Sequence, residues 1–88
     1  MVNAMKAKGI QTEYLQSQCK VDTYLEDIEG EILCAARKGG SNCYFDFKKY
    51  GLDNHILAFA KAQVKDKLRS FGYTSLDGEQ FSEIYIYW

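Results

Sequence analysis

The sequence predicts an α+β fold, in the order α-β-α-β-β, with a three-stranded mixed sheet and helices packed on one face. Apolar residues recur at helical spacing in two long segments, residues 10–38 and 54–71. Apolar and polar residues alternate, as in half-buried strands, in residues 42–47 and 79–88. Because both periodicities occur within one short chain, we expect helices and strands to share one core.

The length of 88 residues, 47% of them hydrophobic, is sufficient for one small domain. We expect residues 1–9 to form a flexible N-terminal arm and residues 10–88 to form a single α+β domain. The aromatic fraction is high at 15%, and aromatic side chains bury much area and are enriched at interfaces. The composition therefore hints at a protein partner.

The first helical segment, residues 10–38, has one apolar face, formed by Tyr14, Val21, Tyr24, Leu25, Ile28, Ile32 and Ala35. The sequence allows one helix, or two helices with Asp22 or Thr23 capping the second and a break near residues 17–22. The doubled glycine Gly39–Gly40 ends the segment.

The first strand, residues 42–47, is expected to bury Cys43, Phe45 and Phe47 and to direct Tyr44 and Asp46 to its other face. Asp53 or Asn54 is expected to cap the following helix, and Gly72 is expected to end it in the left-handed conformation. The apolar stripe of that helix is Ile56, Leu57, Ala60, Val64, Leu68 and Phe71, with lysines on the opposite side.

The C-terminal segment is expected to form a hairpin, because Asp77–Gly78 is a strong signal for a two-residue turn. A short strand over residues 73–76 precedes the turn, and a strand over residues 79–88 follows it. Ile84, Ile86 and Trp88 form the expected core side. A helical crossover makes the first two strands parallel, and the last strand, antiparallel to its predecessor, has room between them.

The face of the sheet opposite the helices is expected to carry Tyr44, Asp46, Tyr85 and Tyr87. Tyrosine rings suit protein contacts, because they are rigid and amphipathic. The candidate protein-contact residues are therefore Tyr44, Tyr85 and Tyr87, together with Tyr14 of the first helical segment. The same rings resemble a stacking platform for single-stranded nucleic acid, but Asp46 and Glu83 on that face would repel phosphates.

The formal net charge is −1, so no overall field favours nucleic acid or a membrane surface. The charges are nevertheless segregated. Residues 22–31 carry five carboxylates, and residues 48–69 are rich in lysine. Two solvated helix faces explain this pattern, and mimicry of nucleic acid by the acidic block is an alternative. No apolar run reaches the roughly 20 residues that a membrane span requires.

No catalytic, cofactor-binding or metal-binding motif is present, so we expect a protein that is not an enzyme and uses no cofactor. His55 lies next to a helix cap, and this position favours its interpretation as a surface residue over a general base. Cys19, Cys34 and Cys43 lack the spacing of a zinc site, even with His55 as a fourth ligand. We expect the three thiols to be free, in a reducing cytoplasmic setting.

Several segments resemble a class of small open reading frames of tailed bacteriophages and prophages. These segments are the leading Met-Val-Asn-Ala, the helix end Ile32–Gly39, the Tyr-Phe-Asp-Phe strand, the stretch Val64–Tyr73 and the terminal Ile-Tyr-Trp. The resemblance spans most of the chain, and the motifs are structural. It implies a phage accessory or virion protein that works by contact, located in the virion or in the bacterial host cytoplasm, and it transfers no site residues.

Three functions follow as hypotheses. The first is a minor virion component or assembly adaptor that grips a neighbour, either another protein or a second copy of itself, with its N-terminal helix and its aromatic sheet face. The second is an early phage protein that binds and inhibits a host factor. The third is a small nucleic-acid-binding module that uses the lysines of the second helical segment, whose binding would depend strongly on salt.

Overall fold

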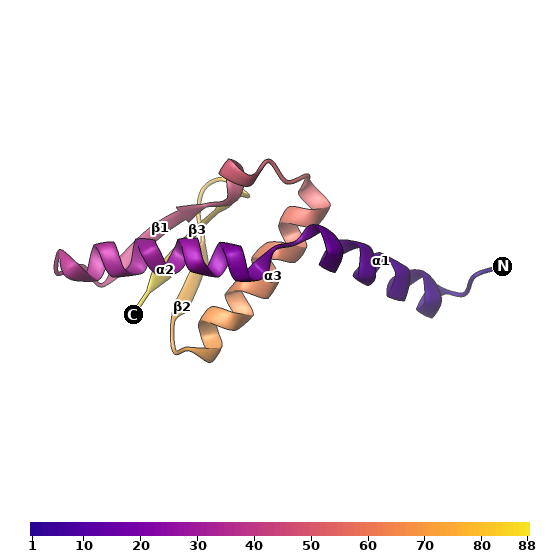
Figure 1. Ribbon diagram of the computed structural model, residues 1–88, viewed down its shortest axis with the longest axis horizontal. Helices are drawn as coiled ribbons and strands as arrows, with labels where there is room; N and C mark the ends of the chain where they lie inside the picture. The colour runs from indigo at the N-terminus through magenta and orange to yellow at the C-terminus, as the bar shows by residue number, and fades with distance from the viewer.

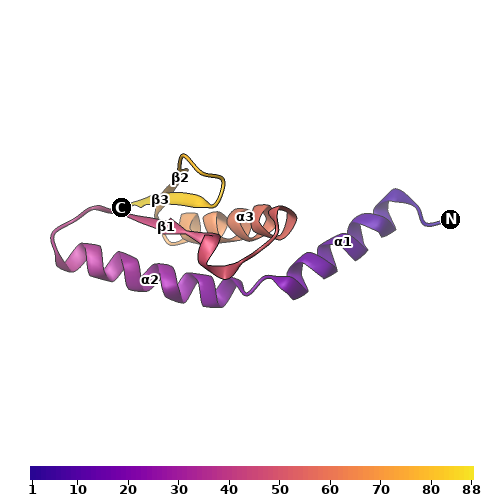
Figure 2. The same cartoon turned by 90° about the horizontal axis from the view of Figure 1, so that it is seen from above.

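The computed structural model describes residues 1–88 and contains three α-helices, one 3-10 turn and three strands. In chain order these elements are α1 (Ala4–Gln18), α2 (Val21–Arg37), β1 (Asn42–Asp46), η1 (Phe47–Tyr50), α3 (Asn54–Ser70), β2 (Thr74–Asp77) and β3 (Glu83–Tyr87). Helices α2 and α3 lie on one side of the sheet, and α1 extends away from the rest of the molecule (Figures 1 and 2).

The sheet has the strand order β1-β3-β2, and both of its ladders are antiparallel. This arrangement confirms the α+β class and the position of the last strand between the other two. Strands β1 and β2 run in the same direction, as expected after a helical crossover, but they do not pair with each other. The sheet is therefore antiparallel throughout, and the expectation of a mixed sheet was wrong in this detail.

The core lies between the sheet and the helices α2 and α3. Its largest fully buried side chains are Phe47, Ile28, Ile84, Ile86 and Val64. Ile84 and Ile86 alternate with the more exposed Tyr85 and Tyr87, as the period of two predicts. Phe47 lies one residue beyond β1, in η1, yet its ring packs edge-on against Phe45 at a centroid distance of 5.1 Å.

Both expected boundaries of the helix α3 are confirmed. The Asp53 carboxylate accepts a hydrogen bond from the backbone N–H of Ile56 at 3.0 Å, which satisfies one of the unpaired donors of the first turn. Gly72 follows the C-cap residue Phe71 with a φ of 93°. A residue with a Cβ atom is strained in this left-handed region, so the glycine ends the helix without cost.

The segment 10–38 forms two helices, which decides between the two alternatives that the sequence left open. The break lies at Cys19 and Lys20, and the N-cap of α2 is Lys20 rather than Asp22 or Thr23. Helix α1 begins at Ala4, so residues 4–9 of the expected arm are helical and continuous with residues 10–18.

The connection between β2 and β3 differs from the expected two-residue turn. Residues 78–82 form the loop, and β3 begins at Glu83 rather than at residue 79. A two-residue type I′ turn needs a positive φ at both central residues, but the φ of Gly78 is not positive. The loop is closed instead by Gly78 N–H, which donates to the Glu83 carbonyl at 2.9 Å, and by Gln80 N–H, which donates to the Glu83 carboxylate at 2.7 Å.

Three side chains lie in places that the sequence pattern did not predict. Phe71, expected in the apolar stripe of α3, is 72% exposed because it caps the helix end. Trp88, expected in the core, is 42% exposed and packs edge-on against Tyr73 at 6.2 Å. Lys61, expected on the solvent side of α3, is only 7% exposed.

Candidate protein-contact site

Tyr44, Tyr85 and Tyr87 lie together on the face of the sheet that no helix covers. The strand register places Tyr44 opposite Tyr85 and places Tyr85 opposite Leu76 on the other side. One row of large side chains therefore crosses all three strands. We call Tyr44, Leu76, Tyr85 and Tyr87 the sheet-face patch, and their exposed fractions are 42%, 54%, 37% and 38%.

Leu76 is the member of the patch that sequence reasoning missed. The expected two-residue turn would have paired it with Glu79, whereas the longer loop pairs it with Tyr85. Its position two residues after Thr74 places both side chains on one face of the strand, but the partner across the ladder depended on the length of the loop.

Hydrogen bonds and ring contacts hold the patch in place. The rings of Tyr44 and Tyr85 are 5.5 Å apart between centroids, within the range of favourable aromatic pairs. The Tyr44 hydroxyl donates to the Glu83 carboxylate and lies 3.4 Å from Asp46 Oδ2. These interactions fix the ring before any partner arrives, which lowers the entropy cost of binding.

The same hydrogen bonds involve the two carboxylates at one end of the patch. The bond to Glu83 and the nearby carboxylate of Asp46 raise the pKa of Tyr44 well above its ordinary value. The Ser82 side chain and the Lys48 backbone N–H hold the pKa of Asp46 below its ordinary value. The patch thus has neutral rings and an anionic end, which is unfavourable for nucleic-acid phosphates.

Tyr14 does not belong to this patch. It lies on α1, which extends away from the sheet, and it is 56% exposed (Figure 2). The structure therefore brings three of the four candidate tyrosines together and leaves the fourth on a separate element.

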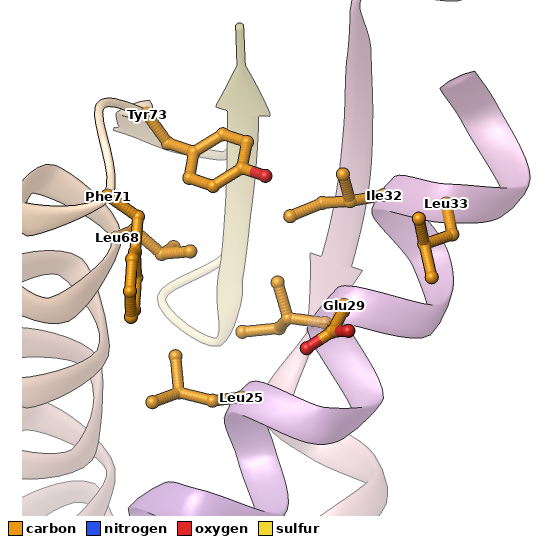
Figure 3. A pocket seen from close by; sticks show the side chains of 8 residues that line it. Leu25, Glu29, Ile32, Leu33, Leu68, Phe71 and Tyr73 are labelled. Atoms are coloured by element: carbon orange, nitrogen blue, oxygen red, sulfur yellow. The ribbon is translucent and has the colours of Figure 1, made fainter.

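A second apolar surface lies between the helices α2 and α3. It is a groove of about 360 Å³, lined by eight residues of which seven are hydrophobic (Figure 3). We call it the α2–α3 groove; its apolar lining includes Leu25, Ile32, Leu33, Leu68, Phe71 and Tyr73. No sequence pattern predicts this groove, because it forms only where two segments far apart in the chain meet.

Lys61 and its partners tie the loop before β3 to α3. The Lys61 ammonium donates to the Phe81 carbonyl at 2.6 Å, lies 3.2 Å from Asp77 Oδ1 and lies 4.5 Å from the Phe81 ring centroid. Lys65 also pairs with Asp77, at 3.1 Å. Two of the lysines that the nucleic-acid hypothesis invoked are thus engaged within the protein.

The remaining candidates for chemistry are dispersed. No group of three or more His, Cys, Asp or Glu side chains is placed to hold a metal ion. His55 and Cys34 are exposed, whereas Cys19 and Cys43 are partly buried, and burial raises the pKa of both of these thiols. None of the helices combines the length and apolar character needed to cross a membrane.

A comparison of the chain with protein-family models, with curated proteins and with solved structures finds no match.

Proposed function

We propose that this protein works by protein–protein contact through the sheet-face patch, as a minor virion component or assembly adaptor of a tailed bacteriophage. The observation that carries the proposal is the row of Tyr44, Tyr85 and Leu76 across all three strands, left uncovered by the helices. The proposed assignment to a phage rests only on the resemblance of the sequence motifs to those of small phage open reading frames.

Three properties of the patch support a protein partner. Tyrosine is enriched where binding energy concentrates, because its ring buries area at a low entropy cost and its hydroxyl keeps a polar contact. The rings are already ordered by their neighbours. Asp46 and Glu83 add a polar rim at one end, which favours a partner surface with basic or hydrogen-bond-donating groups.

The proposal is tested with a double variant, Tyr85→Ala and Tyr87→Ala, in phage that encode this chain. Both side chains lie outside the core, so the fold is expected to survive, which circular dichroism checks. We expect the wild-type chain in purified particles, and we expect the variant to lose affinity for its partner by about tenfold or more.

The matched control is Met5→Ala, which removes an exposed apolar side chain on α1, away from the sheet. It should leave incorporation into particles unchanged. If the double variant enters particles in the same amount as the wild type, the sheet-face contact is refuted.

The second candidate function, inhibition of a host factor, is favoured by the surface of α2. This helix carries five carboxylates and one arginine, and Asp22, Glu26 and Glu29 are all exposed along one side. A basic host protein would complement this surface. Absence of the chain from purified particles, together with capture of a basic host protein that salt releases, would replace the first function by this one.

A further inference from the structure

Helix α1 packs against the rest of its own chain only near its C-terminal end. It comprises 15 residues, none of them buried, and its large apolar side chains Met5, Ile10 and Tyr14 are all more than half exposed. An isolated helix of this length is marginal in water, because most helical stability comes from packing an apolar face. A helix that stays formed here therefore needs a surface to pack against.

The α2–α3 groove is a surface without an occupant. Phe71 is 72% exposed and Leu33 is 43% exposed. Figure 3 shows Leu25 and Ile32 of α2 on one side of an open space and Leu68 and Tyr73 on the other. Side chains of one face of a helix fill such grooves through anchors at positions i, i+3 and i+7. Helix α1 has this spacing at Ala7, Ile10 and Tyr14.

The charges of the two surfaces are complementary. Helix α1 carries two lysines and one glutamate, whereas α2 carries five carboxylates and one arginine. The polar member of the groove lining is Glu29. It lies one helical turn from Glu26 and two from Asp22 on the same side of α2, so an acidic row borders the groove.

The connection between α1 and α2 disfavours folding of α1 onto its own groove. Two antiparallel helices joined by two residues need a sharp reversal, which usually employs a glycine or asparagine in the left-handed region. The connecting residues Cys19 and Lys20 instead have φ values of −99° and −109°. Cys19 also donates a hydrogen bond through its thiol to the Ile56 carbonyl at 3.7 Å, which holds the base of α1 at α3.

We infer that α1 occupies the α2–α3 groove of a second copy of this chain, in a reciprocal two-fold dimer. One helix in one groove buries little area compared with the roughly 1,600 Å² of a standard interface. Reciprocal exchange buries the same pair of surfaces twice. The groove begins at Leu25, about one turn into α2, so each groove lies close to the point where α1 leaves its own chain. This inference is independent of the sheet-face contact.

The first test measures the mass of the full chain by light scattering after size exclusion. We expect about twice the chain mass of 10.1 kDa for the wild type. Tyr14→Asp should raise the dimer dissociation constant by about tenfold or more, because it places a charge in the apolar groove. Met5→Asp is the matched control, since Met5 lies about two and a half turns from Tyr14 on the opposite side of α1, and it should leave the dimer intact.

The second test identifies the groove and separates exchange from self-docking. Chains with Tyr14→Cys are mixed with chains with Phe71→Cys under mild oxidation. We expect a disulfide-linked heterodimer, and we expect far less of it when Met5→Cys replaces Tyr14→Cys. A monomeric wild type, or a dimer that Tyr14→Asp leaves unchanged, would overturn the inference. So would a disulfide that forms within one chain when Tyr14→Cys and Phe71→Cys are combined.

Discussion

Lys61 is the charged residue that the core buries, and its setting explains how a small protein tolerates it. The ammonium group has both a carboxylate partner in Asp77 and a carbonyl partner in Phe81. A buried charge is costly unless it is paired and hydrogen-bonded.

Replacing Asp77 by Asn should destabilise the protein at neutral pH, because Lys61 would lose its counter-charge inside the protein. We expect the free energy of unfolding to fall by about 1–3 kcal/mol. Lys65→Met is the matched control, because it removes the more exposed partner of Asp77 and should cost less than about 1 kcal/mol. Urea denaturation of both variants measures the difference, and equal losses would contradict the role of Lys61.

The pH dependence of this effect has a definite sign. Lys65 and Lys61 hold the pKa of Asp77 below its ordinary value of 3.8. The carboxylate therefore contributes stability above that value, and the contribution is lost as the pH falls through the lower pKa of the folded state. The difference between wild type and Asp77→Asn should thus shrink below about pH 4, and a difference that is constant down to pH 2 would contradict it.

At the scale of the elements, Gly30 in α2 and Gly72 at the end of α3 have opposite roles. Gly30 lies inside α2 with no atom near the position that a Cβ would take, so nothing in the packing requires it. Gly72 ends α3 with a φ of 93°, a conformation that other residues adopt only with strain.

Alanine at these two positions should therefore change stability in opposite directions. Gly30→Ala should stabilise the protein by about 1 kcal/mol, the difference in helix propensity. Gly72→Ala should destabilise it by about 1–2 kcal/mol through left-handed strain. Thermal unfolding followed by circular dichroism compares the pair, and a gain in melting temperature for Gly72→Ala would show that α3 does not need this cap.

At the scale of the whole molecule, the structure has two parts with different support. The helices α2 and α3 and the sheet share one core, whereas α1 extends from it and gives the molecule its longest dimension of 57 Å (Figure 1). An extended helix and an open groove in one chain suit an assembly better than an isolated monomer.

Hydrogen exchange should distinguish these parts. In dilute solution we expect the amides of α1 to exchange fast and those of α2 and α3 to exchange slowly, because only the latter pack on the core. Raising the protein concentration should slow exchange in α1 alone as dimers form, and Tyr14→Asp should abolish that change. Slow exchange of α1 in dilute solution would instead indicate that it packs within its own chain.

The sequence by itself determined the features that depend on local periodicity and on special backbone positions. The alternation around Tyr85 and Ile86 set the two faces of the last strand. The pair Asp53–Asn54 marked the start of α3, and Gly72 marked its end. The α+β class followed from these elements, and the connection rules left room for the last strand between the other two.

Only the tertiary structure decided what lies opposite each element. The loop of residues 78–82, the burial of Lys61 and the exposure of Trp88 depend on partners far away in the chain. The α2–α3 groove exists because Leu33 and Phe71 come from different helices that the sheet holds side by side. Periodicity tells which side of an element is apolar, but the long-range packing of the elements decides which part of that side stays uncovered.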